Sequence, residues 1–142
     1  GLFGEELIKN FKNSQIYGSD ISQKSLDIAK EKKIYENLIK INFENKKIYK
    51  IKFDLVSMIG AMTYCKNFKK LFANVKYYLI QKGYFIFSHR TDLWEKQDFY
   101  KILDELKLNF KIIYISRPCN YLPMNKDFKN IIKIRLVLLQ KC

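Results

Sequence analysis

The sequence predicts an α/β fold in which a mostly parallel sheet is covered by helices and ends with one antiparallel strand. Segments patterned as strands alternate with segments of helical period as far as about residue 106, which is typical of parallel strands joined by helices. Two strand-like segments then follow one another without a helix between them, and this indicates an antiparallel pairing. The chain has 142 residues, about the size of one domain, and contains no internal repeat. We therefore predict that residues 1–142 form a single domain.

The predicted helices carry apolar residues at spacings of three and four, with lysines on their exposed sides. They cover residues 2–13, 22–33, 66–81 and 92–106. A Lys82-Gly83 pair predicts the C-terminal cap of the third helix. The predicted strands are short and apolar, and they cover residues 16–20, 37–42, 53–59, 84–88, 110–116 and 131–140.

Lysine dominates the charge of the chain. Lys and Arg together number 27 against 14 acidic residues, which gives a net charge of +13. A nucleic-acid-binding surface favours arginine and clusters its positive charge. Here only Arg90, Arg117 and Arg135 are arginines, and the lysines are spread along the chain. The joint excess of Lys, Asn, Ile, Tyr and Phe is typical of an AT-rich coding sequence, so we favour a small-molecule substrate over a nucleic acid.

Apolar runs, cysteine spacing and histidine content bear on where the protein is located and on whether it binds a metal. No apolar run approaches the ~18 residues that a membrane span needs, and the first residues do not resemble a secretory signal. The three cysteines are far apart without a C-x-x-C pair, as expected for a reducing compartment. His89 is the only histidine, so we expect no metal site. We predict a cytoplasmic protein without a membrane segment, and the sequence does not indicate its oligomeric state.

The stretch from residue 16 to residue 29 has the pattern of a nucleotide-binding strand and helix. Gly18 allows close approach to a neighbouring strand, and Ser22 is placed to cap the helix. Asp20 stands where the strand ends, and ligands of open α/β sheets bind outside that end of the strands. Its carboxylate could accept hydrogen bonds from two ribose hydroxyls, or it could be a solvated turn residue. Gly1 lies about 20 residues upstream, the usual gap from a Gly-rich turn to its ribose acid.

These motifs and their order resemble class I S-adenosylmethionine-dependent methyltransferases, and the resemblance spans essentially the whole chain. The matching segments are Gly-x-Asp-Ile-Ser-x-x-x-Leu-x-x-Ala at residues 18–29, Phe-Asp-Leu-Val at 53–56 followed by Gly60, and Lys-Gly-Tyr-Phe-Ile-Phe at 82–87. Three more segments look like the methyltransferase-like group named for the Williams–Beuren region: Leu-Phe-Gly-Glu-Glu-Leu at 2–7, Tyr-Glu-Asn-Leu at 35–38 and Arg-Thr-Asp-Leu-Trp-Glu at 90–95.

The resemblance implies a Rossmann-like, doubly wound sheet of strand order 3-2-1-4-5-7-6, in which the first strand is absent from this chain. Gly1 would then be the last glycine of the family's Gly-x-Gly-x-Gly loop, so we expect an N-terminally truncated domain. Whether the truncation is biological, and whether the truncated chain binds its cofactor alone, the sequence leaves open.

The implied cofactor is S-adenosyl-L-methionine, and the resemblance assigns it a set of residues. These are Gly1, Asp20, Ile21, Asn42, Phe43, Ile59, Gly60 and Ala61. Asp20 would hold the ribose, whereas Ile21 and Phe43 would flank the adenine. Asn42 replaces the family's usual Asp beside the adenine amino group; an Asn can still accept that hydrogen bond, or it could be an ordinary turn residue.

Methyl transfer needs little acid–base help because the donor carries its own leaving group, so the catalytic residues are left unassigned. His89 and Asp92 are weak candidates for a base, and Asp92 has the alternative of a helix cap. The candidate substrate-pocket residues are Met62, Tyr64, Arg90, Trp94 and Tyr121. Trp94 could instead be a core residue without a role in binding, and Arg90 could be an ordinary surface residue.

We therefore expect an S-adenosylmethionine-dependent methyltransferase that acts on an unidentified, small-molecule acceptor. One alternative is a nicotinamide-dependent oxidoreductase, although no Tyr-x-x-x-Lys pair is visible on a predicted helix. The other is a non-catalytic, basic remnant of the fold that binds nucleic acid.

Overall fold

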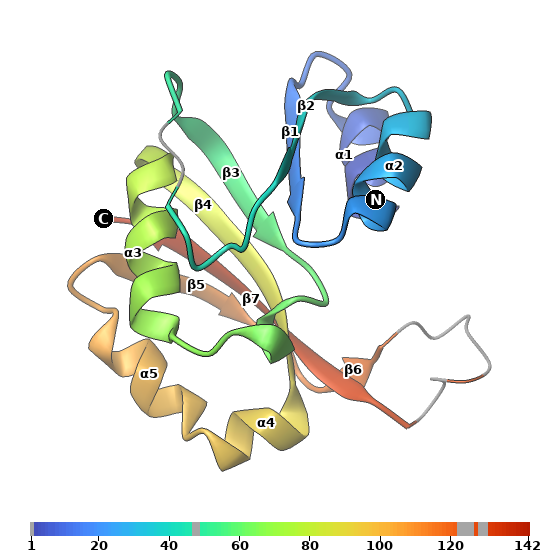
Figure 1. The fold of residues 1–142 in the computed structure, drawn as a ribbon. Coiled ribbons are helices and arrows are strands. Elements are labelled where there is room, and N and C mark those ends of the chain that lie inside the picture. The colour runs from blue at the N-terminus through green and yellow to red at the C-terminus, as the bar shows by residue number, and fades with distance from the viewer. Residues whose placement is uncertain (1, 47–48, 122–126, 128–130) are drawn as a thin grey trace. The chain divides into compact units, whose positions relative to one another are not determined.

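The computed structural model describes residues 2–46, 49–121, 127 and 131–142. The chain divides into two compact units, Gly1–Lys46 and Lys47–Cys142, and each is described by itself (Figure 1). The single domain expected from the sequence stays a prediction.

The first unit is a parallel strand pair with its connecting helix. Its elements are α1 (Leu2–Asn10), β1 (Ile16–Asp20), α2 (Gln23–Glu31) and β2 (Tyr35–Lys40). β1 pairs with β2 in parallel, with Gly18 opposite Leu38. Helix α2 ends two residues before the expected boundary because Lys33 adopts a left-handed conformation, with φ at 54°.

Gly18 holds the two strands and their side chains close together, as its position in the sequence predicted. A Cβ atom on Gly18 would lie 2.6 Å from Cδ2 of Leu38 and 3.1 Å from Cδ1 of Tyr35. Opposite this strand, Leu26 and Ala29 of α2 are buried. The amphipathic spacing of α2 therefore does what the sequence indicated, because it turns both apolar positions inward.

The second unit contains a five-stranded mixed sheet. Its strands are β3 (Phe53–Met58), β4 (Leu79–Arg90), β5 (Phe110–Ile115), β6 (Cys119–Asn120) and β7 (Lys133–Lys141). The order is β3-β4-β7-β5, and β6 also pairs with β7. Only β3 and β4 are parallel here; β7 runs antiparallel to β4, β5 and β6.

The expected "mostly parallel" sheet is therefore corrected to a mixed one. The order implied by the resemblance already placed the last strand between two others, but the expectation of a mostly parallel sheet did not allow for its antiparallel pairing on both sides. Because β7 has antiparallel partners on both sides, one reversed strand changes several pairings. The complete order 3-2-(1)-4-5-7-6 spans both units and stays a prediction.

Helices pack on one face of this sheet. They are α3 (Phe68–Tyr78), α4 (Thr91–Lys96) and α5 (Phe99–Glu105), with a 3₁₀ turn at Met62–Tyr64. Phe72 of α3 contacts both Phe85 and Phe87 of β4, and Phe87 also contacts Phe99 of α5. These four phenylalanines are at most 2% exposed, so the core of this unit is largely aromatic.

Several boundaries differ from the prediction, and two of the differences change the elements themselves. Lys82-Gly83 does not cap α3, which ends at Tyr78 with Leu79 as its C-cap; the pair lies within β4. It forms an irregularity there, because the register moves from Phe53–Leu79 to Leu55–Tyr84. The helix expected over residues 92–106 is two helices, α4 and α5, interrupted at Asp98, whose φ is 48°.

Candidate functional site

Asp20 is the last residue of β1, and its side chain turns toward the start of α2. Its Oδ1 atom accepts a hydrogen bond of 2.8 Å from the backbone N–H of Ser22. Ser22 is the N-cap of α2 as predicted, because its hydroxyl accepts a hydrogen bond from the N–H of Ser25. The second carboxylate oxygen of Asp20 has no hydrogen-bond partner among the residues that the structure describes. A half-buried carboxylate is thus held in one orientation with one oxygen left for a ligand.

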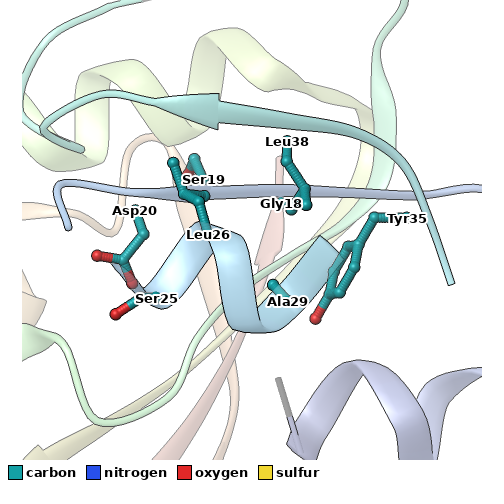
Figure 2. A pocket seen from close by; sticks show the side chains of 8 residues that line it. All are labelled: Gly18, Ser19, Asp20, Ser25, Leu26, Ala29, Tyr35 and Leu38. Atoms are coloured by element: carbon teal, nitrogen blue, oxygen red, sulfur yellow. The ribbon is translucent and has the colours of Figure 1, made fainter. Parts of the chain in front are cut away.

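A hollow of about 100 Å³ lies between the strand pair and α2 (Figure 2). Asp20 and Ser25 lie at one end of it, and Ala29 and Tyr35 lie at the other. Nucleoside-sized ligands need pockets of roughly 300 Å³ or more. The hollow is therefore too small for an adenosine, and a ligand held by Asp20 would lie outside the strand ends.

The end of β2 lies beside Asp20. The backbone N–H of Ile41 donates a 3.0 Å hydrogen bond to the carbonyl of Asp20, so Asn42 follows directly at the same edge. The side-chain oxygen of Asn42 accepts a hydrogen bond from the N–H of Glu44 at 2.9 Å. Asn42 thus closes a turn, and Phe43 within that turn is half-buried. Ile21 is 67% exposed beside Asp20 and offers an apolar surface at the strand end.

In the second unit, the predicted cofactor residues Ile59, Gly60 and Ala61 follow the carboxyl end of β3. Gly60 has a φ of 80°, and its N–H donates a 2.8 Å hydrogen bond to the hydroxyl of Ser88 on β4. A Cβ atom on Gly60 would lie 3.0 Å from the hydroxyl oxygen of Tyr121. Ile59 is 38% exposed and Ala61 is half-buried. Gly60 is therefore needed both for its backbone conformation and for its lack of a side chain.

The residues predicted to line a substrate pocket fall into two groups. Met62 and Trp94 are buried, with exposures of 0% and 3%, and they belong to the core. Tyr64, Arg90 and Tyr121 retain exposed surface, and Tyr64 is 75% exposed.

Arg90 and Asp92 form an ion pair at the start of α4. Nε and Nη2 of Arg90 donate to the two carboxylate oxygens of Asp92, at 3.0 and 2.7 Å. This pair lowers the pKa of Asp92, chiefly through the hydrogen bonds from Arg90. Asp92 lies in the first turn of α4, and the N-cap position itself belongs to Arg90. A carboxylate held ionised by an arginine is a weak base, so the geometry favours positioning over proton transfer.

His89 is buried beneath this edge. It is 1% exposed, and its Nε2 atom lies 2.8 Å from Oε1 of Gln97. Burial lowers the pKa of His89, and the hydrogen bond to Gln97 only partly opposes this effect. The ring contacts Phe68 and Phe99. Such a site favours a neutral core histidine, and nothing in its exposure supports the predicted catalytic role.

The decisive finding is a match of residues 1–87, more than half of the chain, to a protein family described as a methyltransferase domain. The chain belongs to this methyltransferase domain family. The matched residues include both the Asp20 strand end of the first unit and the Gly60 turn of the second.

Solved structures show that this methyltransferase domain shares its fold with known enzymes. An S-adenosylmethionine-dependent methyltransferase from Clostridium acetobutylicum has a TM-score of 0.75 at 18% identity, covering 99% of this chain and 79% of that one. N-methyltransferase NodS from Bradyrhizobium japonicum, in complex with S-adenosylhomocysteine, has a TM-score of 0.72 at 12% identity, covering 99% and 72%. Plantazolicin methyltransferase BpumL, bound to a desmethylplantazolicin analogue and S-adenosylhomocysteine, has a TM-score of 0.76 at 13% identity, covering 99% and 72%. No curated protein sequence matches the chain.

The family binds S-adenosylmethionine, and two of these similar structures contain its demethylated product, so the predicted cofactor is confirmed at the level of the family. In this methyltransferase domain the residues at the edge of the first unit fit an adenosine. Asp20 offers a free carboxylate oxygen to a hydroxyl donor, and Ile21 offers an exposed apolar surface to a base. Gly1, the remaining predicted contact, lies outside the described residues.

Sequence reasoning missed Ser88 and Gln97. Ser88 is 2% exposed and accepts the hydrogen bond from Gly60, whereas Gln97 holds His89. Neither belongs to a motif, and only the pairing of β3 with β4 brings Ser88 to Gly60. Among the described residues, no group of three His, Cys, Asp or Glu side chains could hold a metal ion. No described helix is long and apolar enough to span a membrane.

Proposed function

We propose that this chain is an S-adenosylmethionine-dependent methyltransferase in which Asp20 holds the ribose of the cofactor. The observation that carries the proposal is the state of the Asp20 carboxylate. One of its oxygens is fixed by the N–H of Ser22, and the other has no partner among the described residues. Such a carboxylate, at the carboxyl end of a parallel strand, suits a pair of neighbouring hydroxyl groups.

The adenine would lie between Ile21 and Phe43, beside Asn42. Because the Oδ1 atom of Asn42 already accepts from Glu44, its amide N–H₂ is the group more available to a base. An adenine ring nitrogen is an acceptor and would suit this donor. The family's usual carboxylate would instead accept from the adenine amino group.

Gly1, Ile59, Gly60 and Ala61 would border the methionine part and the methyl group. S-adenosylmethionine supplies the electrophilic methyl and a neutral leaving group when it is bound. The chain's own residues orient the acceptor and exclude water, and this positioning accounts for most of the rate. Gly60, fixed by Ser88 and covered by Tyr121, presents a rigid backbone for that purpose.

The acceptor proposed is a small molecule. NodS is named as an N-methyltransferase and BpumL as the plantazolicin methyltransferase. Both are similar to this chain in fold. Tyr64, Arg90 and Tyr121 provide exposed polar groups after β3 and β4, while Met62 and Trp94 would support them from the core. His89 and Asp92 would help to position the acceptor and would not remove a proton from it.

The finer assignments rest on the resemblance and are proposals too. They are membership of the Williams–Beuren-like group, a cytoplasmic location, and the seven-strand order of the sheet. The family match favours methyl transfer over the nicotinamide-dependent alternative. A nucleic-acid substrate is the remaining alternative, since an rRNA methylase from Streptococcus thermophilus is also similar in fold, with a TM-score of 0.59.

The proposal is tested by titrating the full-length protein with S-adenosylhomocysteine in a calorimeter. Asp20→Ala removes a charge-assisted acceptor, so we expect its affinity to fall by about 1–2 kcal/mol, roughly 5- to 30-fold. Asp27→Ala is the matched control, because Asp27 is an exposed carboxylate on α2 that contacts Gln23. Equal affinities of the Asp20 variant and the unaltered protein would remove Asp20 from the site.

A further inference from the structure

A second cavity, lined by none of the residues proposed to contact the cofactor, lies between α3 and the α5–β5 segment. Its volume is about 520 Å³, within the range of small-molecule sites. Every lining residue belongs to the second unit, and none was predicted to contact the cofactor or the acceptor. The proposed methyl transfer therefore leaves this cavity without a role.

The floor of the cavity is apolar and aromatic. Phe72 and Phe110 are 2% and 1% exposed, and their rings meet edge to face with centroids 6.2 Å apart. Phe68, Ile102 and Leu106 are half-buried along its sides. A ligand that displaces water from this floor would gain the free energy of apolar contact.

The rim of the cavity is mainly positive. Lys69 and Lys76 stand two turns apart on α3, and Glu105 is the one acidic residue that lines the cavity. Nζ of Lys76 donates a hydrogen bond to the side-chain oxygen of Asn109, which fixes its ammonium group at one end. Neither lysine forms an ion pair within the described part of the chain.

More positive charge gathers at that same end, around the C-terminus of α3. Nζ of Lys141 donates to the carbonyl oxygens of Lys76 and Leu79, at 2.9 and 2.8 Å, and Nζ of Lys52 donates to that of Tyr77 at 2.7 Å. The carbonyl ends of a helix attract cations. Even so, burial and the charges of Lys52 and Lys76 lower the pKa of Lys141. An anion at this end would relieve that repulsion.

We propose that the cleft between α3 and α5 binds a small amphipathic monoanion, with its apolar body on the Phe72–Phe110 floor and its carboxylate at Lys76. The charge of the rim disfavours a cation, and the apolar floor disfavours a free inorganic anion. A medium-chain acyl or aryl carboxylate fits both.

The test uses three eight-carbon probes that differ only in their head group: octanoate, octanol and octylammonium. Binding to the 142-residue chain is measured by calorimetry and by ligand-observed NMR. We expect octanoate to bind at least about 10-fold more tightly than octylammonium, because the rim carries a net positive charge. A naphthoate titration, run in parallel, distinguishes an aryl from an acyl preference.

Lys76→Gln should weaken octanoate binding about 5-fold or more, since it removes a charged partner. Lys70→Gln makes the same change on the same helix but outside the cavity, and it should leave the affinity within about 2-fold. Ala73→Leu places a larger side chain in the cavity and should weaken all three probes, and its fold is checked by circular dichroism.

Two results would overturn the proposal. They are equal affinities for the three head groups and an unchanged octanoate affinity in Lys76→Gln.

Discussion

His89 is a candidate base by sequence, and the structure places it in the core of the second unit. A lone histidine at the end of a strand suggested a base, yet the structure buries it in a cluster of aromatic rings. Its Nδ1 atom and the indole nitrogen of Trp94 are both buried without a hydrogen-bond partner. Such a site tolerates the neutral imidazole and disfavours the cation.

This burial gives a pH dependence of stability. The pKa of His89 is lowered in the fold from about 6.5, so the unfolded chain binds the extra proton first and stability falls as pH drops below about 6.5. Urea unfolding should therefore show stability falling between pH 6.5 and 5, and the share due to His89 cannot exceed about 1.4 kcal/mol per pH unit, the limit for one proton. His89→Phe should flatten this slope, because no other histidine is present. An unchanged slope in that variant would contradict the neutral, buried state.

Gly60 gives a second prediction at the scale of one residue. Its φ of 80° and the nearby hydroxyl of Tyr121 both oppose a side chain. Gly60→Ala should lower the free energy of unfolding by about 1–2 kcal/mol. Tyr121→Ala in the same chain should restore only the steric part. Full restoration would show that the backbone conformation costs nothing, and no loss in the single variant would show that the turn is not strained.

Helices whose apolar residues recur at regular spacing could be predicted from the sequence. Features that depend on how strands pair could not. Helix α2 lies where its apolar spacing and Ser22 cap indicated. The Lys82-Gly83 pair was read as a helix end because that is its usual local meaning. In the structure it lies in β4, next to a shift of register against β3, which no local pattern encodes. The break at Asp98 was missed because a positive φ is uncommon for any residue other than glycine, although Asp adopts it more readily than most.

Gly83 tests this account of β4. A Cβ atom there would lie 3.1 Å from the carbonyl oxygen of Ile80 and 3.2 Å from that of Asp54. Both are backbone atoms and cannot rotate away, so Gly83→Ala should destabilise the protein by about 1–3 kcal/mol. Thermal and urea unfolding measure this loss. If Gly83 were only a helix cap, Asn would substitute well for it; we expect Gly83→Asn to be at least as harmful as Ala.

At the scale of the molecule, the sequence indicated the class of fold and the family, but not the balance of parallel and antiparallel pairs. The position of β7 between β4 and β5 depends on contacts far apart in the chain, so only the resemblance to a family, and no local pattern, implied it. The candidate site likewise contains residues that motifs identify and residues that only the folded structure identifies. Asp20, Ile21 and Gly60 could be named from their motifs, whereas Ser88 and the turn made by Asn42 depend on neighbours that the motifs do not contain.

The charge of the whole chain leads to a further prediction. With a net charge of +13, the positive side chains repel one another in the folded state. The four ion pairs found in the described residues offset little of this repulsion because most of them are exposed. Raising NaCl from about 10 to 300 mM should therefore raise the Tm, since screening acts mainly on repulsion. A Tm that falls with salt would mean that attractive pairs dominate.

The most direct test of the central claim is a structure of the full-length protein with S-adenosylhomocysteine. We predict that the Asp20 carboxylate lies about 2.7 Å from a ribose hydroxyl oxygen, with the adenine beside Ile21. An adenosine bound elsewhere, with the Asp20 carboxylate left in solvent, would contradict the account.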